Sequence, residues 1–146
     1  MAENYTLRCK DCGSDQSEAF ASFCPNCGGL IEARYDLREV KLRDSDDPHQ
    51  RYFDLLPVRD EKLLAPGLRT RTVHARNLGS RLGLNRLFLK DETENRTGTT
   101  KDRMAAVALP FLYEGGVRHF CASSTGNSST SYAQACLLYT SDAADD

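Results

Sequence analysis

The amino-acid sequence predicts an α/β fold in which a small metal-bound module precedes the start of a mainly parallel sheet. Three observations support this prediction. Apolar stretches with strand character alternate with helical stretches from Leu68 to Ala135, the pattern of parallel α/β units. Two closely spaced cysteine pairs precede this region, in a segment too small for a stable core of its own. The 146 residues are 40% hydrophobic and 27% charged, as in an ordinary folded domain.

The sequence divides into four regions. Residues 1–37 carry the two cysteine pairs and are expected to form the small module. Residues 38–67 read as a charged linker followed by a short amphipathic helical stretch. Residues 68–135 are the partial α/β domain, and residues 136–146 form a tail of different character.

The cysteine pairs have the spacing of a metal site. Two C-x2-C turns, separated by residues 13–23, bring four thiolates into reach of one tetrahedral ion. The predicted ligands are Cys9, Cys12, Cys24 and Cys27. Four protein ligands leave no open coordination position, so the sequence predicts a structural zinc ribbon. Iron in place of zinc, four unliganded thiols and a redox pair are the alternatives.

The partial α/β domain is expected to contain five elements. In order, they are a helix over 73–82 ended by Gly83, a strand over 86–90, a helix over 101–114 closed by Gly115 and Gly116, a strand over 118–123 and a helix from Ser128. Pro110 lies inside the second helix and lacks an N–H, which predicts a kink or an early stop near Leu109.

Lys101 stands at the entrance of the predicted helix over 101–114, after a polar turn. An amine near the positive end of a helix loses its proton more easily and can condense with an aldehyde. The alternative is a lysine on a solvated helix, which describes most lysines. The residues around Lys101 decide between these interpretations.

The segment over 90–103 resembles the lysine motif of fold-type II pyridoxal-phosphate (PLP) enzymes, K-x-E-x-x-N-P-T-G-S-F-K-D-R. The matching positions are Lys90, Glu92, Asn95, Thr97, Gly98, Lys101, Asp102 and Arg103. Arg96, Thr99 and Thr100 depart from the pattern. The resemblance implies a fold-type II PLP enzyme in which Lys101 is the catalytic, cofactor-binding lysine.

A second segment, residues 121–131, is a hydroxyl-rich turn that resembles the S-x-G-N loop of the same family. The resemblance implies that Asn127 binds the cofactor and that Ser124, Thr125 and Ser128 bind the substrate carboxylate. Backbone N–H groups and hydroxyls at a helix start also form an anion site on physical grounds. An ordinary Ser/Thr-rich turn is the alternative.

The combination of a four-cysteine module with the segments IEARYDL and RYFDLLP resembles the threonine synthase branch of the family. Val73 departs from this branch, which has a proline in its T-P-L region. The branch implies that O-phosphohomoserine and water become threonine and phosphate. The alternatives are another PLP replacement or elimination such as cysteate synthesis or serine/threonine dehydration, a zinc-ribbon binding module without catalysis, and a non-catalytic remnant.

Charge and hydropathy limit the classes of partner that the sequence predicts. The net charge of -2 and pI near 5.9 give no basic footprint for nucleic acid, so a small amino-acid substrate is expected. The sequence has neither a stretch that predicts a membrane span nor a secretory signal, and a cytoplasmic location is expected. The family resemblance implies a homodimer or a monomer.

The tail over 136–146 resembles the translation of a sequencing-library transposon adapter. Its character does not continue that of the preceding helix, and we therefore expect the natural reading frame to have been cut after about Ala135. A genuine polar C-terminus is the alternative. The loop for the cofactor phosphate and the partner of the pyridine nitrogen have no match before Asp146, so the 146-residue polypeptide is expected to be inactive.

Overall fold

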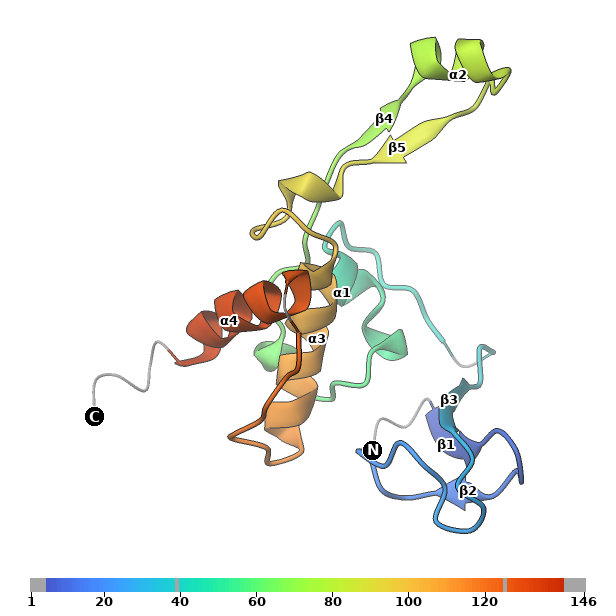
Figure 1. Ribbon diagram of the computed structural model, residues 1–146, viewed down its shortest axis with the longest axis vertical. Coiled ribbons are helices and arrows are strands. Elements are labelled where there is room, and N and C mark those ends of the chain that lie inside the picture. Colours follow the sequence, from blue (N-terminus) through green and yellow to red (C-terminus); the bar gives the residue numbers. More distant parts are fainter. Residues whose placement is uncertain (1–4, 39, 125, 141–146) are drawn as a thin grey trace.

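Figure 1 shows the computed structural model of the chain, which describes residues 5–38, 40–124 and 126–140. A small sheet lies near the N-terminus, two helices cross in the body, and a two-stranded arm with a helix at its tip projects from that body. Helices and strands are both present, so the predicted α/β class is confirmed in this coarse sense.

The N-terminal module is an antiparallel sheet of β1 (Tyr5–Cys9), β2 (Asp15–Gln16) and β3 (Ile31–Tyr35), in the order β2-β1-β3. Leu7 lies opposite Gln16 on one side and Ala33 on the other. An isolated bridge between Phe23 and Leu30 brings the second cysteine pair toward the end of β1. Three short strands therefore position all four predicted metal ligands.

The segment that follows contains short turns in place of the expected amphipathic helix. They are α1 (Pro48–Arg51) and the 3-10 turns η1 (Phe53–Leu55) and η2 (Glu61–Leu63). Pro57 explains the interruption, because a proline disfavours helical backbone at the preceding residue. Leu56 is accordingly extended, with φ -90° and ψ 150°.

The projecting arm pairs β4 (Thr72–His74) with β5 (Phe88–Lys90), and α2 (Arg76–Leu82) lies at its tip (Figure 1). The predicted start of the helix at Val73 is wrong, because Val73 pairs with Leu89 in the ladder. The strand predicted over 86–90 is confirmed for its last three residues, Phe88–Lys90. Gly83 ends α2 as expected, with φ +70°.

The expected parallel sheet is not formed by the described residues, whose strand pairs are all antiparallel. Helix α2 has seven residues, which span only about 10 Å, and it turns the chain back at the tip of the arm. The strand predicted over 118–123 is also absent. A strand needs a neighbour to complete its ladder, and the described part of the chain supplies none there.

The body is built from α3 (Lys101–Glu114) and α4 (Asn127–Thr140). Ala105 and Leu109 of α3 pack against Ala135 of α4, and these three side chains are buried. The helix over 101–114 is confirmed with its predicted bounds. The expected early stop at Pro110 is wrong, since α3 continues to Glu114 and the ring of Pro110 is fully buried.

Helix α4 also continues beyond Ala135 up to Thr140, so the helix does not end where the character of the sequence changes. Residues 141–146 lie outside the described residues. Within the described part of the chain, we find no helix with the length and apolar character that a bilayer crossing requires.

The module contacts the body at the C-terminal end of α3. The rings of Phe20 and Phe111 lie 5.2 Å apart, and the Tyr35 hydroxyl donates to Leu55 O at 3.1 Å. The Glu114 carboxylate accepts the backbone N–H groups of Arg59 and Asp60, which fixes the connecting segment to the end of α3. The start of α3, with Lys101, lies at the other end of the helix, where the base of the arm and α4 contact it.

Candidate functional site

The local backbone explains why the cysteine pairs converge. The N–H of Gly13 donates to Cys9 O at 3.0 Å, and the N–H of Gly28 donates to Cys24 O at 2.8 Å. Both glycines have positive φ, of 73° and 74°, which residues with a side chain rarely adopt. Each pair therefore forms a tight knuckle that directs two sulfur atoms to the same side.

The four sulfur atoms form one cluster, with all of them within 4.8 Å of one another. The Sγ atoms of Cys9 and Cys27 are 3.5 Å apart, and those of Cys12 and Cys24 are 3.7 Å apart. A tetrahedral zinc ion with Zn–S bonds of about 2.3 Å requires sulfur separations of about 3.8 Å. The cluster therefore fits a four-thiolate metal ion, as the spacing predicts.

Ser14 is a neighbour of this cluster that the spacing did not reveal. Its hydroxyl lies 3.1 Å from Cys12 Sγ and 3.4 Å from Cys24 Sγ, and it accepts a hydrogen bond from Gln16 Nε2 at 2.9 Å. The hydrogen bond from Ser14 lowers the pKa of the Cys24 thiol to about 6. A thiol that is deprotonated near neutral pH is suited to bind a cation.

The second site is the start of α3, where a tight turn precedes Lys101. The N–H of Gly98 donates to Asn95 O at 2.8 Å, and Gly98 has a φ of +74°. Asn95 is buried and donates its amide to Thr99 O at 2.9 Å. The Lys101 N–H then donates to Thr99 Oγ1 at 2.9 Å as α3 begins. The matched motif residues thus shape the turn into the lysine helix.

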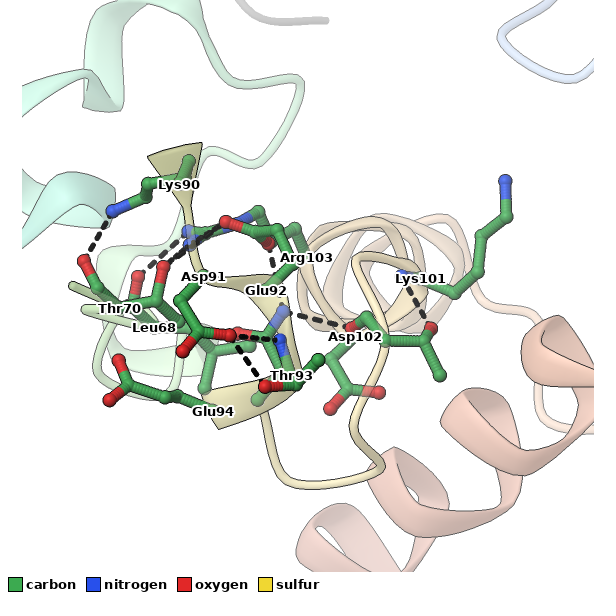
Figure 2. A network of polar contacts seen from close by, with 12 residues as sticks. Leu68, Thr70, Lys90, Asp91, Glu92, Thr93, Glu94, Lys101, Asp102 and Arg103 are labelled. Atoms are coloured by element: carbon green, nitrogen blue, oxygen red, sulfur yellow. Dashed lines mark hydrogen bonds and ion pairs between the residues drawn. The ribbon is translucent and has the colours of Figure 1, made fainter. Parts of the chain in front are cut away.

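The Lys101 side chain is exposed and points away from the polar network that surrounds the turn (Figure 2). Among the described residues, its amine has no hydrogen-bond or ion-pair partner. The amine is therefore accessible to a ligand that approaches the start of α3.

A network between Glu92 and Arg103 secures this turn against α3 (Figure 2). Arg103 Nε donates to Glu92 Oε2 at 2.7 Å, and Arg103 Nη2 donates to Glu92 Oε1 at 2.9 Å. Arg103 also donates to Leu68 O and to Thr70 Oγ1, at 2.7 and 3.0 Å. The Arg103 hydrogen bond is the main reason that the pKa of Glu92 is lowered to about 2.

Asn127 is the first residue of α4 and is exposed, as is Ser124, while Ser128 is half-buried. Ser124 Oγ accepts the N–H of Gly126 at 3.4 Å, and Ser124 O accepts the Ser129 hydroxyl at 2.5 Å. The predicted substrate residue Thr125 lies outside the described residues.

The first turn of α3 contacts α4 near its start, because Asp102 accepts a hydrogen bond from Ser131, the fifth residue of α4, at 2.5 Å. Lys101 and Asn127 therefore belong to two helix starts that the fold brings together. A cleft of about 550 Å³ lies elsewhere, at the opposite end of α3 beside Phe20, Phe111 and Glu114. It contains none of the predicted site residues.

Comparison with known proteins decides the family. Residues 64–143 match the family described as "Pyridoxal-phosphate dependent enzyme". The chain belongs to this pyridoxal-phosphate-dependent enzyme family. The match covers more than half of the chain and includes both Lys101 and Asn127.

Named relatives of this PLP-enzyme chain carry two different activities. It is 34% identical to a threonine synthase of Methanocaldococcus jannaschii, over 86% of this chain and 33% of the relative. It is 30% identical to a threonine synthase of Methanosarcina acetivorans, over 88% of this chain and 33% of that relative. It is 27% identical to a cysteate synthase of Methanosarcina mazei, over 95% of this chain and 34% of that relative. The chain thus spans about a third of the length of these relatives, and no solved structure matches it.

The residues at the two helix starts fit PLP. Lys101 offers an unpartnered amine for the aldehyde, and the exposed start of α4 offers backbone N–H groups and hydroxyls. No Cβ-sized obstacle lies near Gly126, so a ligand can approach the backbone there. The family membership implies PLP as the cofactor, and these residues are the candidates to hold it.

Proposed function

We propose that the protein is a threonine synthase-type enzyme that converts O-phosphohomoserine and water to threonine and phosphate. One observation carries the proposal: the unpartnered Lys101 amine opens α3, and Asp102 beside it bonds to Ser131, which follows Asn127 by four residues in α4. The two threonine synthases among the relatives support the choice of substrate. The activity is proposed for the full-length gene product.

Each predicted site residue has a role in this proposal. PLP, when bound, supplies an electron sink that stabilises negative charge at the substrate Cα. Lys101 holds the cofactor and moves the proton at Cα. Asn127 orients the cofactor ring, and Ser124, Thr125 and Ser128 bind the substrate carboxylate beside the start of α4. Zinc at Cys9, Cys12, Cys24 and Cys27 has a structural role, because four thiolates leave no position for substrate.

A cysteate synthase is the second candidate, and the relative from Methanosarcina mazei favours it. Threonine has a four-carbon chain, whereas cysteate has three carbons and a sulfonate. The two activities therefore need different amino-acid substrates and different groups added at Cβ. A zinc-ribbon binding module without catalysis would leave the Lys101 and Asn127 motifs without a role.

The proposal is tested on the full-length protein that contains this chain. The protein is mixed with PLP, reduced with borohydride and digested, and the labelled peptide is identified by mass spectrometry. We expect the label on Lys101 and its loss in Lys101→Ala. Lys62→Ala, which changes an exposed lysine of η2, is the matched control and should keep the label.

Product analysis then separates the two activities. Unreduced enzyme with PLP is supplied with O-phosphohomoserine in one assay, and with a three-carbon amino acid bearing a Cβ leaving group plus sulfite in another. Threonine in the first assay supports the proposal, and cysteate in the second supports the alternative. Absence of any label on Lys101 would exclude both.

A further inference from the structure

A buried carboxylate joins the two helix starts. Asp102, the second residue of α3, is 4% exposed, and its Oδ1 accepts the Ser131 hydroxyl at 2.5 Å. Thr97 donates its backbone N–H to Asp102 Oδ2 at 2.7 Å and its hydroxyl to Oδ1. The hydroxyls of Thr97 and Ser131 lie 3.1 Å apart. These three residues form a closed group, named here the Asp102 cluster.

Hydrogen bonds to an ionised carboxylate hold the Asp102 cluster together. Burial raises the pKa of Asp102, but hydrogen bonds from Ser131 and Thr97 and the charge of Arg96 outweigh burial and lower the pKa. The carboxylate is therefore ionised at neutral pH, and charge-assisted bonds are about twice as strong as neutral ones. Ser131 is 0% exposed, so water does not replace Asp102 as its partner. Buried and satisfied polar groups of this kind fix the geometry around them.

The cluster connects directly to both predicted cofactor segments. Asp102 is next to Lys101 in the first turn of α3. Ser131 follows Asn127 by four residues and Ser128 by three, so all three lie on the same face of α4. A constraint on Ser131 is therefore a constraint on the loop that precedes it.

We infer that Asp102, Thr97 and Ser131 are positioning residues that fix the start of α4, with Asn127, relative to Lys101 before PLP binds. The inference rests on the proposed function for its role in cofactor binding. It adds residues that touch neither cofactor nor substrate and act through the two helix starts. A preformed arrangement lowers the ordering cost of binding.

The test compares Ser131→Ala with Thr130→Ala in the full-length protein. Alanine favours helix more than serine does, so Ser131→Ala removes the bond to Asp102 without weakening α4 itself. Thr130 is the matched control, because among the described residues its exposed hydroxyl contacts only Gly126 O, just before the start of α4, at 3.5 Å. We expect Ser131→Ala to raise the dissociation constant for PLP by about 10- to 100-fold. Thr130→Ala should change it less than about 3-fold.

Hydrogen exchange of the PLP-free protein gives a second readout that does not depend on the cofactor. Ser131→Ala should speed exchange in residues 121–131 and at the Thr97 amide, and Thr130→Ala should not. If wild type lacks PLP on Lys101 but shows this pattern, the proposed function fails and the structural part of the inference stands. If wild type carries PLP and Ser131→Ala matches it in affinity and exchange, the inference is overturned.

Thr97 offers an independent variant if Ser131→Ala folds poorly. Thr97→Val keeps the shape and the N–H but removes the hydroxyl that contacts Asp102 and Ser131. Thr97→Ser restores that hydroxyl. PLP affinity that falls in Thr97→Val and recovers in Thr97→Ser supports the cluster, and equal affinity in both variants contradicts it.

Discussion

Arg103 holds Glu92 by two parallel hydrogen bonds, Nε to Oε2 at 2.7 Å and Nη2 to Oε1 at 2.9 Å. Glu92 belongs to the 3-10 turn η3 (Glu92–Glu94), which follows β5, and Arg103 belongs to α3. The same guanidinium reaches Leu68 O at the base of the arm. One arginine therefore connects the arm to the helix that carries Lys101.

Arg103→Lys should destabilise the protein although it keeps the charge. A lysine cannot make the paired contact with Glu92 or hold Leu68 O and Thr70 Oγ1 at the same time. We expect a loss of about 1–3 kcal/mol in the free energy of unfolding, measured by urea denaturation of the full-length protein. The bonds are only partly exposed to water, with Arg103 and Glu92 side chains 32% and 25% exposed.

Arg69→Lys is the matched control for this change. Arg69 approaches Asp46 at 3.8 Å, and both side chains are mostly exposed. Exposed pairs contribute little, so this variant should remain within about 0.5 kcal/mol of wild type. Equal effects of the two substitutions would contradict a structural role for the Arg103 contact.

The same pair predicts a pH dependence of stability. In the folded protein, hydrogen bonding to Arg103 lowers the pKa of Glu92 from its ordinary 4.5 to about 2. A lowered folded-state pKa gives stability that is complete above the unfolded-state pKa and is lost as pH falls through the folded-state value. The stability advantage of wild type over Glu92→Gln should therefore shrink as pH falls from about 5 to about 2.

Urea denaturation at a series of pH values measures this difference. Asp36 and Asp102, whose pKa values are also lowered, titrate in both proteins and cancel in the comparison. The pKa of Asp91 is lowered mainly by its hydrogen bond from Thr93, but the charge of Glu92 also acts on it, so Asp91 adds a smaller difference of its own. Arg103, Asn95 and Thr70 donate hydrogen bonds to Glu92, and of these donors only Arg103 is charged. A difference that stays constant with pH would show that Glu92 is not held ionised by Arg103.

Local patterns in the sequence predicted the features that depend on neighbouring residues. The C-x2-C spacing sets the geometry of each knuckle, so the convergence of Cys9 with Cys27 was predictable. The helix over 101–114 was predicted with its bounds because Gly115 and Gly116 end it. The N–H of Gly116 donates to Tyr113 O at 3.0 Å, and Gly116 has a φ of +82°.

Contacts between distant segments were not predictable in the same way. The pairing of Val73 with Leu89 overrides the helical pattern around Val73, because strand pairing depends on a partner sixteen positions away. The bond between Asp102 and Ser131 joins residues that are 29 positions apart, and no spacing rule relates them. Phe120 packs against Tyr132, with rings 5.6 Å apart, where the sequence predicted a strand.

The cysteine cluster predicts about one zinc ion per full-length chain. Cys12→Ser should lose the metal, since three thiolates bind zinc less tightly than four, and exchange of the β1 and β3 amides should become faster. Cys121→Ser is the control, because Cys121 is exposed and lies outside the cluster. Elemental analysis measures the metal, and a result of iron in place of zinc would correct the identity of the ion. Equal metal content in the two variants would contradict the site.

Gly79→Ala tests the arm, because we expect this change to destabilise α2 although alanine usually stabilises a helix. In an exposed helix, this change stabilises by about 1 kcal/mol, because alanine is the better helix former. Gly79 is instead buried in α2, and a Cβ there would lie 2.4 Å from Leu84 O. That carbonyl cannot retreat easily, because the Leu84 N–H donates to Gly79 O at 2.8 Å and Gly83 fixes the turn.

We therefore expect Gly79→Ala to destabilise the arm by about 1–3 kcal/mol, seen as faster hydrogen exchange of the amides in residues 75–87. Ser80→Ala, at the next position of the same helix, is exposed and should leave exchange unchanged or slower, in line with helix propensity. If both alanines slow the exchange, the close approach of Gly79 to Leu84 O is absent in solution. If only Gly79→Ala speeds it, the turn after α2 requires glycine at position 79 because of packing against the Leu84 carbonyl.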